Sequence, residues 1–114
     1  MRSTLAEMYW PLMDLPSVRL RRCAVCGATW PLNQHHAVWR GWGKLFDADG
    51  REREKPTITL CGSGNTGGCH GLAHAHRLHF RNNNGRWEYL LLDSPLRYER
   101  AIEIEEGWKP CATY

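Results

Sequence analysis

The sequence predicts a small α+β domain whose apolar core needs extra stabilisation. Its 114 residues fit one domain, and a chain of this length buries only about 65% of its unfolded surface. Eleven glycines and six prolines dilute the core further. Five cysteines and six histidines gather mostly in two clusters, and an odd cysteine count argues against a framework of disulfides. These observations favour a bound metal as the extra stabilisation.

Each element is predicted from a local pattern. Thr4 and Glu7 can form a capping box, short β-branched and aromatic segments indicate strands, and Asn83-Asn84-Gly85 is typical of a hairpin turn. Ser94-Pro95 fits the start of a helix that Gly107 would end, although Ile102-Glu103-Ile104 alternates like a strand. In chain order we expect a helix at 4–9, strands at 18–21 (or extended coil), 36–39 and 57–60, a helix at 69–78, a strand at 87–92 and a helix at 95–106.

The chain divides into an N-terminal arm (1–17), a core (18–80) and a C-terminal extension of the same domain (81–114). Residues 1–60 and 61–92 carry net charges of +3 and +2, while residues 93–114 carry −2. The basic excess therefore lies with the cysteines and histidines, where a polyanion would bind. No apolar run approaches the ~18 residues of a membrane-spanning helix, and Glu7 together with the lack of an apolar stretch argues against a secretory signal.

The cysteine spacing predicts a structural zinc. Cys23 and Cys26 have the C-x2-C spacing that lets one tight turn bind a tetrahedral Zn²⁺. Cys61 and Cys69 are the candidates that complete the site, separated by a glycine-rich loop that is longer than usual but able to fold back. The alternative is two unrelated pairs of reduced thiols. Cys111 has no partner and is expected to be a free thiol.

The histidines favour a second metal site. His35 and His36 are adjacent, so in a strand they point to opposite faces, whereas His70 and His74 share one face of a helix and can chelate a divalent ion. His76 and His79 lie off that face or at the end of the helix. Any one of these residues alone would be typical of a surface or capping histidine. As a group beside a zinc site, they favour a metal.

In chain order these motifs resemble the HNH endonucleases, which are ββα-metal nucleases. The resemblance covers roughly residues 20–80 and is closest to the small HNH proteins of bacteriophages and prophages. Two features depart from the family. Its middle Asn is absent from residues 55–59, and its glycine pair is altered in Gly41-Trp42-Gly43-Lys44. The segments that carry the resemblance are Cys23-x2-Cys26, Gln34-His35-His36-Ala37-Val38, Thr59-Leu60-Cys61-Gly62-Ser63-Gly64 and Cys69-His70-Gly71-x2-His74.

The resemblance implies a small zinc-stabilised ββα-metal (His-Me finger) domain with a short flanking helix and a β-hairpin. It implies that His36 is the general base and that Arg40 lies near the scissile phosphate. One catalytic cation (Mg²⁺, Mn²⁺, Ni²⁺ or Zn²⁺) would be held by His35, His70 and His74. The structural zinc would be held by Cys23, Cys26, Cys61 and Cys69.

This chemistry is consistent with the residue types. An imidazole, with an unperturbed pKa of about 6.5, can accept a proton at neutral pH, and a cation bound by neutral imidazoles keeps its charge for a phosphate. Basic residues that contact phosphates would position a duplex without reading its sequence. The candidates for such contacts are Arg19, Arg21, Arg22, Arg40, Lys44, Arg77 and Arg81. We expect the nearby tryptophans, Trp30, Trp39 and Trp42, to lie in the core with Trp87.

We therefore expect a metal-dependent endonuclease that acts on double-stranded DNA in a bacterial host cell and is encoded by a phage or prophage. The resemblance suggests packaging (terminase) proteins as partners, and no membrane is expected. The alternative from another class is a non-catalytic zinc module that docks on DNA or protein. That module would bind one metal per chain, whereas the nuclease would bind two. An RNA-directed nuclease, or a toxin- or antitoxin-like element, is a further alternative that substrate assays would separate.

Overall fold

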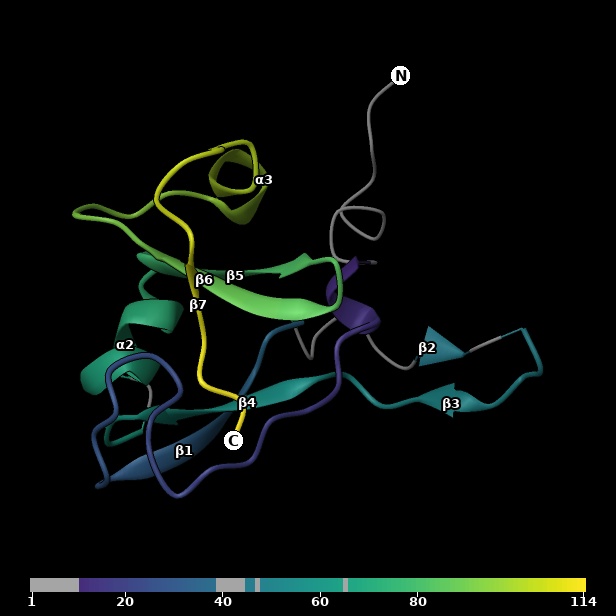
Figure 1. Ribbon diagram of the computed structural model, residues 1–114, viewed down its shortest axis with the longest axis horizontal. Coiled ribbons are helices and arrows are strands. Elements are labelled where there is room, and N and C mark those ends of the chain that lie inside the picture. The colour runs from purple at the N-terminus through teal and green to yellow at the C-terminus, as the bar shows by residue number, and fades with distance from the viewer. Residues whose placement is uncertain (1–10, 39–44, 47, 65) are drawn as a thin grey trace.

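The computed structural model describes residues 11–38, 45–46, 48–64 and 66–114 (Figure 1). The strands of this part of the chain form three antiparallel sheets, and residues 11–13 are helical. None of its helices has the length and apolar character needed to cross a bilayer. The sheets are β1 (Leu32–His36) with β4 (Thr57–Cys61), β2 (Leu45–Phe46) with β3 (Glu52–Arg53), and β5 (Leu78–Asn83) with β6 (Arg86–Leu91) and β7 (Lys109–Pro110). The helices are α2 (Gly68–His74) and α3 (Tyr98–Ala101).

Strand β4 organises the half of the domain that carries the clustered cysteines and histidines. It pairs with β1 along one edge, and on its other edge the Val18 backbone bridges Ile58 in parallel. The Val18 N–H donates to the carbonyl of Thr57 at 2.8 Å, and the Val18 carbonyl accepts from the Thr59 N–H at 3.1 Å. All five residues of β4 are buried. The strand is therefore a rigid support for whatever its neighbours carry.

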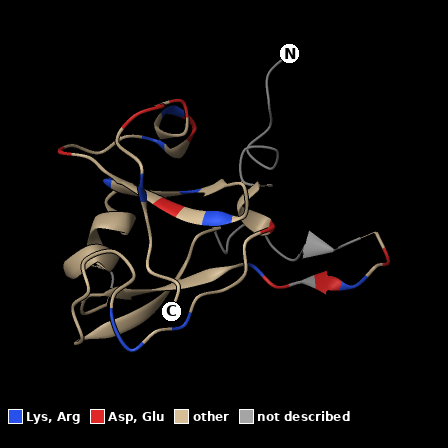
Figure 2. Cartoon of the chain, viewed as in Figure 1, with Lys and Arg blue, Asp and Glu red and all other residues tan. Residues whose placement is uncertain are grey.

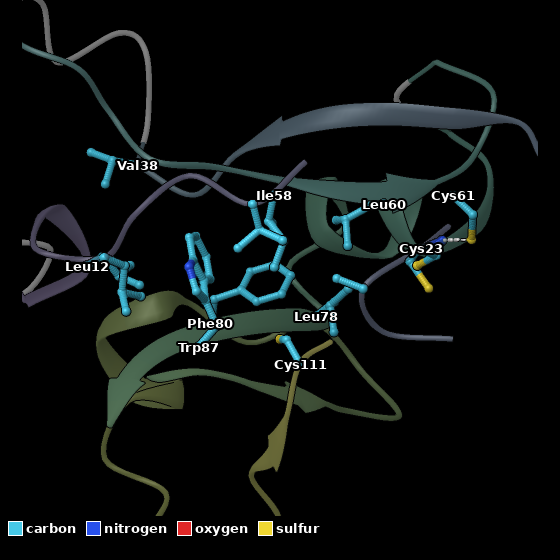
Figure 3. Close-up of a cluster of buried hydrophobic side chains, with 14 of the residues drawn as sticks. Leu12, Cys23, Val38, Ile58, Leu60, Cys61, Leu78, Phe80, Trp87 and Cys111 are labelled. Atoms are coloured by element: carbon cyan, nitrogen blue, oxygen red, sulfur yellow. Dashed lines mark hydrogen bonds between the residues drawn. The ribbon is translucent and has the colours of Figure 1, made fainter. Parts of the chain in front are cut away.

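The core lies between β4 and the β5–β6 sheet (Figure 3). Ile58 and Leu60 of β4 face Leu78, Phe80 and Trp87, and these side chains are almost fully buried. The rings of Phe80 and Trp87 meet edge to face at 5.8 Å, a favourable aromatic geometry. Both ends of the described chain join this core.

At the N-terminal end, Leu12 is buried, and the carbonyl of Pro16 accepts from the Trp87 indole at 2.8 Å. At the other end, the Cys111 N–H donates to the Trp87 carbonyl at 3.0 Å. The Ala112 N–H donates to the Ala24 carbonyl at 2.9 Å. The C-terminal segment thereby joins the β5–β6 sheet to the cysteine-bearing turn.

Three local predictions are confirmed. The strand expected at 57–60 is β4, and the strand expected at 87–92 is β6, each within one residue at either end. Asn84 and Gly85 form the turn between β5 and β6, with φ values of 53° and 86°. Two consecutive positive φ values match the twist of a two-residue hairpin, which is why the Asn-Gly pair was informative.

The prediction of a strand at 36–39 is wrong, because β1 spans Leu32–His36. Local propensity favoured the apolar residues after His36, but pairing with β4 selects the polar stretch before it. Gln34 Nε2 donates to the Val18 carbonyl at 2.6 Å, and Asn33 Nδ2 donates to the Gly62 carbonyl. These polar side chains thus find partners that only the tertiary structure supplies. The strand predicted at 18–21 is reduced to the bridge at Val18.

Both long helices predicted after residue 68 are shorter than expected. Helix α2 ends at His74, and His76 has a left-handed φ of 60°. From Leu78 the chain is β5, because it pairs with β6 across the hairpin. The helix predicted at 95–106 is only α3, and the Leu96 N–H donates to the distant His76 carbonyl at 2.9 Å. The helix predicted at 4–9 lies outside the described residues.

The expected burial of the tryptophans is confirmed for Trp87, which is 2% exposed, and wrong for Trp30, which is 84% exposed. Trp39 and Trp42 lie outside the described residues. Trp30 lies at the surface, two residues before the start of β1. Its apolar character alone therefore did not decide its position.

The glycine-rich loop brings the start of α2 back onto the end of β4. Gly62 and Gly68 have φ values of 140° and 60°, which side chains rarely adopt. A Cβ at Gly62 would lie 2.0 Å from the Gly67 carbonyl oxygen, and one at Gly68 would lie 2.6 Å from the Cys61 carbonyl oxygen. The close approach of these backbones requires glycine, and it sets Cys69 beside Cys61.

Candidate metal centres

The four predicted cysteines form one cluster. Cys23 and Cys26 lie in the turn before β1, Cys61 is the last residue of β4, and Cys69 lies in the first turn of α2. Their sulfur atoms all lie within 4.8 Å of one another, and the Sγ atoms of Cys26 and Cys61 are 3.5 Å apart. A tetrahedral zinc with bonds of about 2.3 Å sets its sulfurs about 3.8 Å apart. The cluster fits a zinc site, and the alternative of two unrelated pairs is wrong.

Backbone N–H groups lie close to the sulfur atoms of this cluster and favour their negatively charged, thiolate form. The N–H groups of Val25 and Cys26 lie 3.4 and 3.5 Å from Cys23 Sγ, and the Cys69 N–H lies 3.4 Å from Cys61 Sγ. A hydrogen bond from the Cys69 thiol, with further backbone donors, lowers the pKa of Cys23 to about 4. The same bond raises the pKa of Cys69. One thiolate is thus present at neutral pH to receive a cation.

Cys111 lies outside the cluster and, as predicted, is a free thiol. It is buried against the β5–β6 sheet. Burial raises its pKa to about 12. Its thiol is therefore neutral at physiological pH.

The three predicted histidine ligands also meet. His35 comes from β1, and His70 and His74 come from successive turns of α2. Their possible ligand atoms lie within 4.8 Å of one another, and the Nε2 atoms of His70 and His74 are 3.1 Å apart. Two nitrogens on a tetrahedral zinc are about 3.3 Å apart. We call these residues the histidine triad, and their spacing suits one divalent cation.

The surroundings keep the triad neutral and oriented. His70 Nδ1–H donates to the Gly64 carbonyl at 2.8 Å, so its Nε2 lone pair faces the other two rings. Burial, then the neighbouring imidazoles, lowers the pKa of His35 to about 3. Burial likewise lowers the pKa of His70. Protons therefore compete little with a metal at these two residues near pH 7.

The triad opens into a cleft of about 550 Å³. His35 and His74 line it, and so does His36, the last residue of β1. The strand and the helix that carry the triad contribute no formal charge to the cleft. Neither β1 nor α2 contains Lys, Arg, Asp or Glu (Figure 2). The chemistry that β1 and α2 bring to the cleft is therefore that of imidazoles and of a cation they could hold.

Sequence reasoning missed the part of the cleft wall that α3 contributes. Arg97, Tyr98 and Glu99, from the start of α3, line it together with Phe80 of β5. Their only local pattern was that of a helix, and their proximity to the triad depends on the hairpin that intervenes. His76 and His79 line the cleft but are outside the triad.

The predicted phosphate-contacting residues are not equivalent. Arg19, Arg21 and Arg22 are exposed, and Arg22 Nη2 donates to the Tyr114 carbonyl at 2.7 Å. Arg77 is half-buried, and its Nε donates to the Leu92 carbonyl at 3.0 Å. Arg81 is held by an ion pair of 2.7 Å with Glu88. The remaining candidates, Arg40 and Lys44, lie outside the described residues.

Comparisons of the chain with known proteins gave no match to a protein-family model, to a curated protein or to a solved structure. The functional conclusion therefore rests on the cysteine cluster, the histidine triad and the cleft. The cysteine cluster and the pair His70 and His74 were predicted from residue spacing, His35 was added by the resemblance, and the cleft came from the fold.

Proposed function

We propose that this protein is a metal-dependent endonuclease of the HNH type that cleaves double-stranded DNA. One observation carries the proposal. The possible ligand atoms of the histidine triad lie within 4.8 Å of one another at a cleft that His36 also lines. A metal-binding imidazole and a candidate base therefore come from neighbouring residues of one strand. This pairing suits the hydrolysis of a phosphodiester.

The order of elements around the triad supports the proposal. An antiparallel pair, β1 and β4, is followed by α2, which packs on it. This order of elements is consistent with the ββα arrangement that the resemblance to HNH endonucleases implies. Cys61 and Cys69 close the loop between β4 and α2, so a zinc at the cysteine cluster would fix the helix relative to the sheet.

The proposed reaction divides the work between the chain and a cation. A divalent cation bound by the triad would offset phosphate charge and stabilise the leaving oxygen. His36 accepts a proton from a water whose oxygen forms the new bond to phosphorus while the bond to the leaving oxygen breaks. His35 and His70, held neutral by burial, keep the pocket available to a cation. Phe80, whose ring lies 5.9 Å from that of His35, helps to hold His35 in place.

The missing middle Asn is compatible with this proposal. Such a residue can brace the loop between the two strands, and here the backbone provides a brace. The Ala37 N–H donates to the Pro56 carbonyl at 3.1 Å, directly beyond the ends of β1 and β4. This bond fixes the chain next to His36. The proposed phage or prophage origin and the packaging partners rest on the resemblance alone.

Plasmid relaxation tests the proposed function. Supercoiled DNA incubated with the zinc-loaded protein should be cut when Mg²⁺, Mn²⁺, Ni²⁺ or Zn²⁺ is added, and not without it. His74→Ala should remove most of this activity, since it deletes one of three ligands. His74 is exposed, so the variant should still fold.

His76→Asn is the control for the plasmid assay. His76 is an exposed histidine of the same cleft but outside the triad, and Asn tolerates its left-handed backbone. We expect this variant to keep most of the activity. A folded, zinc-loaded wild-type protein that cuts with none of these ions would contradict the proposal and favour a docking module.

A further inference from the structure

The start of α3 forms a fixed wall of the cleft. The Leu96 N–H donates to the His76 carbonyl at 2.9 Å, and His79 Nε2–H donates to the same oxygen at 2.9 Å. Tyr98 is buried, with its ring 6.1 Å from that of His79. The hydrogen bond of Leu96 and the packed ring of Tyr98 therefore hold this segment at the cleft.

Arg97 stands out on this wall. Among the described residues that line the cleft it is the only lysine or arginine, and its side chain is 86% exposed. Its Nη1 lies 3.9 Å from Glu99 Oε1, a distance at the limit of an ion pair and open to solvent, so the contact is weak. The guanidinium fork matches the oxygens of a phosphate.

We propose that Arg97 binds a phosphate of the DNA strand that enters the cleft, and that Glu99 competes with this phosphate for the guanidinium. The inference rests on the proposed nuclease function for its substrate. It does not depend on the metal, because Arg97 belongs to the C-terminal extension rather than to the triad. It gives that extension a role in substrate binding.

Duplex binding tests the inference. The variants Arg97→Gln, Arg100→Gln and Glu99→Gln are made in a zinc-loaded His36→Ala protein, so that bound DNA stays intact. Arg100 is an exposed residue of α3 that is not among the described residues lining the cleft, so Arg100→Gln removes the same charge from outside it. Affinity for a short fluorescent DNA duplex is measured over a series of salt concentrations.

We expect Arg97→Gln to weaken binding roughly tenfold and to reduce the slope of log K against log salt by about 0.9. Arg100→Gln should change both much less, and Glu99→Gln should tighten binding. Equal effects of Arg97→Gln and Arg100→Gln would overturn the inference and leave the proposed nuclease intact. Failure of the His36→Ala protein itself to bind the duplex would overturn both. Zinc content and thermal unfolding confirm that each variant is folded.

Discussion

Replacing Cys69 by alanine is expected to release the zinc and unfold most of the domain. A structural zinc contributes roughly 10–16 kcal/mol of apparent binding free energy in small zinc domains, and a whole domain is stable by only about 5–15 kcal/mol. Cys69 joins α2 to β4 through Cys61 and to the turn at Cys23. Loss of this one ligand should therefore affect the strand, the helix and the turn together.

Cys111→Ala is the matched control for Cys69→Ala, because it removes one buried sulfur from outside the cluster. We expect it to retain a full equivalent of zinc and to lose about 1 kcal/mol of stability, a typical cost of a point substitution. Zinc content and thermal unfolding followed by circular dichroism measure both variants. A Cys69→Ala protein that keeps its zinc and its wild-type melting temperature would contradict the structural role of the cluster.

Replacing His36 by alanine is expected to lower the rate of DNA cleavage roughly 10²–10⁴-fold, the usual contribution of a general base. The variant should keep its zinc and bind the second metal, because His36 belongs to neither cluster. Added imidazole should restore part of the rate, since the cleft of about 550 Å³ can admit it. Cleavage rates on supercoiled plasmid, with and without imidazole, are the measurement.

Three outcomes distinguish the possible roles of His36. Rescue by imidazole, in a variant whose melting temperature matches the wild type, is the result that a base predicts. Unchanged cleavage in His36→Ala would show that another group activates the water. Loss of activity together with loss of the second metal would assign His36 to metal binding instead.

Two pairs of metal ligands could be predicted because their pattern is local, whereas His35 was expected only from the family resemblance. Cys23 and Cys26 lie in one turn, and His70 and His74 lie on successive turns of one helix. The hairpin turn at Asn84-Gly85 could also be predicted from its local sequence. A hairpin turn also implies a strand before it, and that strand is β5. The helical pattern of residues 69–78 concealed this strand, which begins at Leu78.

Other features depend on contacts between distant residues and had no local signal. The start of β1 at Leu32 is set by pairing with β4 and by the partner that Gln34 finds in Val18. The shortness of α3 reflects the bond from Leu96 to His76. The placement of Arg97 at the cleft depends on the same bond, so it became visible only in the folded chain.

We propose that the chain carries two different metal centres. Counting bound metal by native mass spectrometry during a zinc titration tests it most directly, with wild type, His74→Ala and Cys69→Ala compared. We expect the wild type to bind one zinc tightly and a second more weakly, and His74→Ala to lose only the second. A wild type that binds a single zinc, unchanged by His74→Ala, would contradict the claim and leave a zinc-stabilised docking module as the better description.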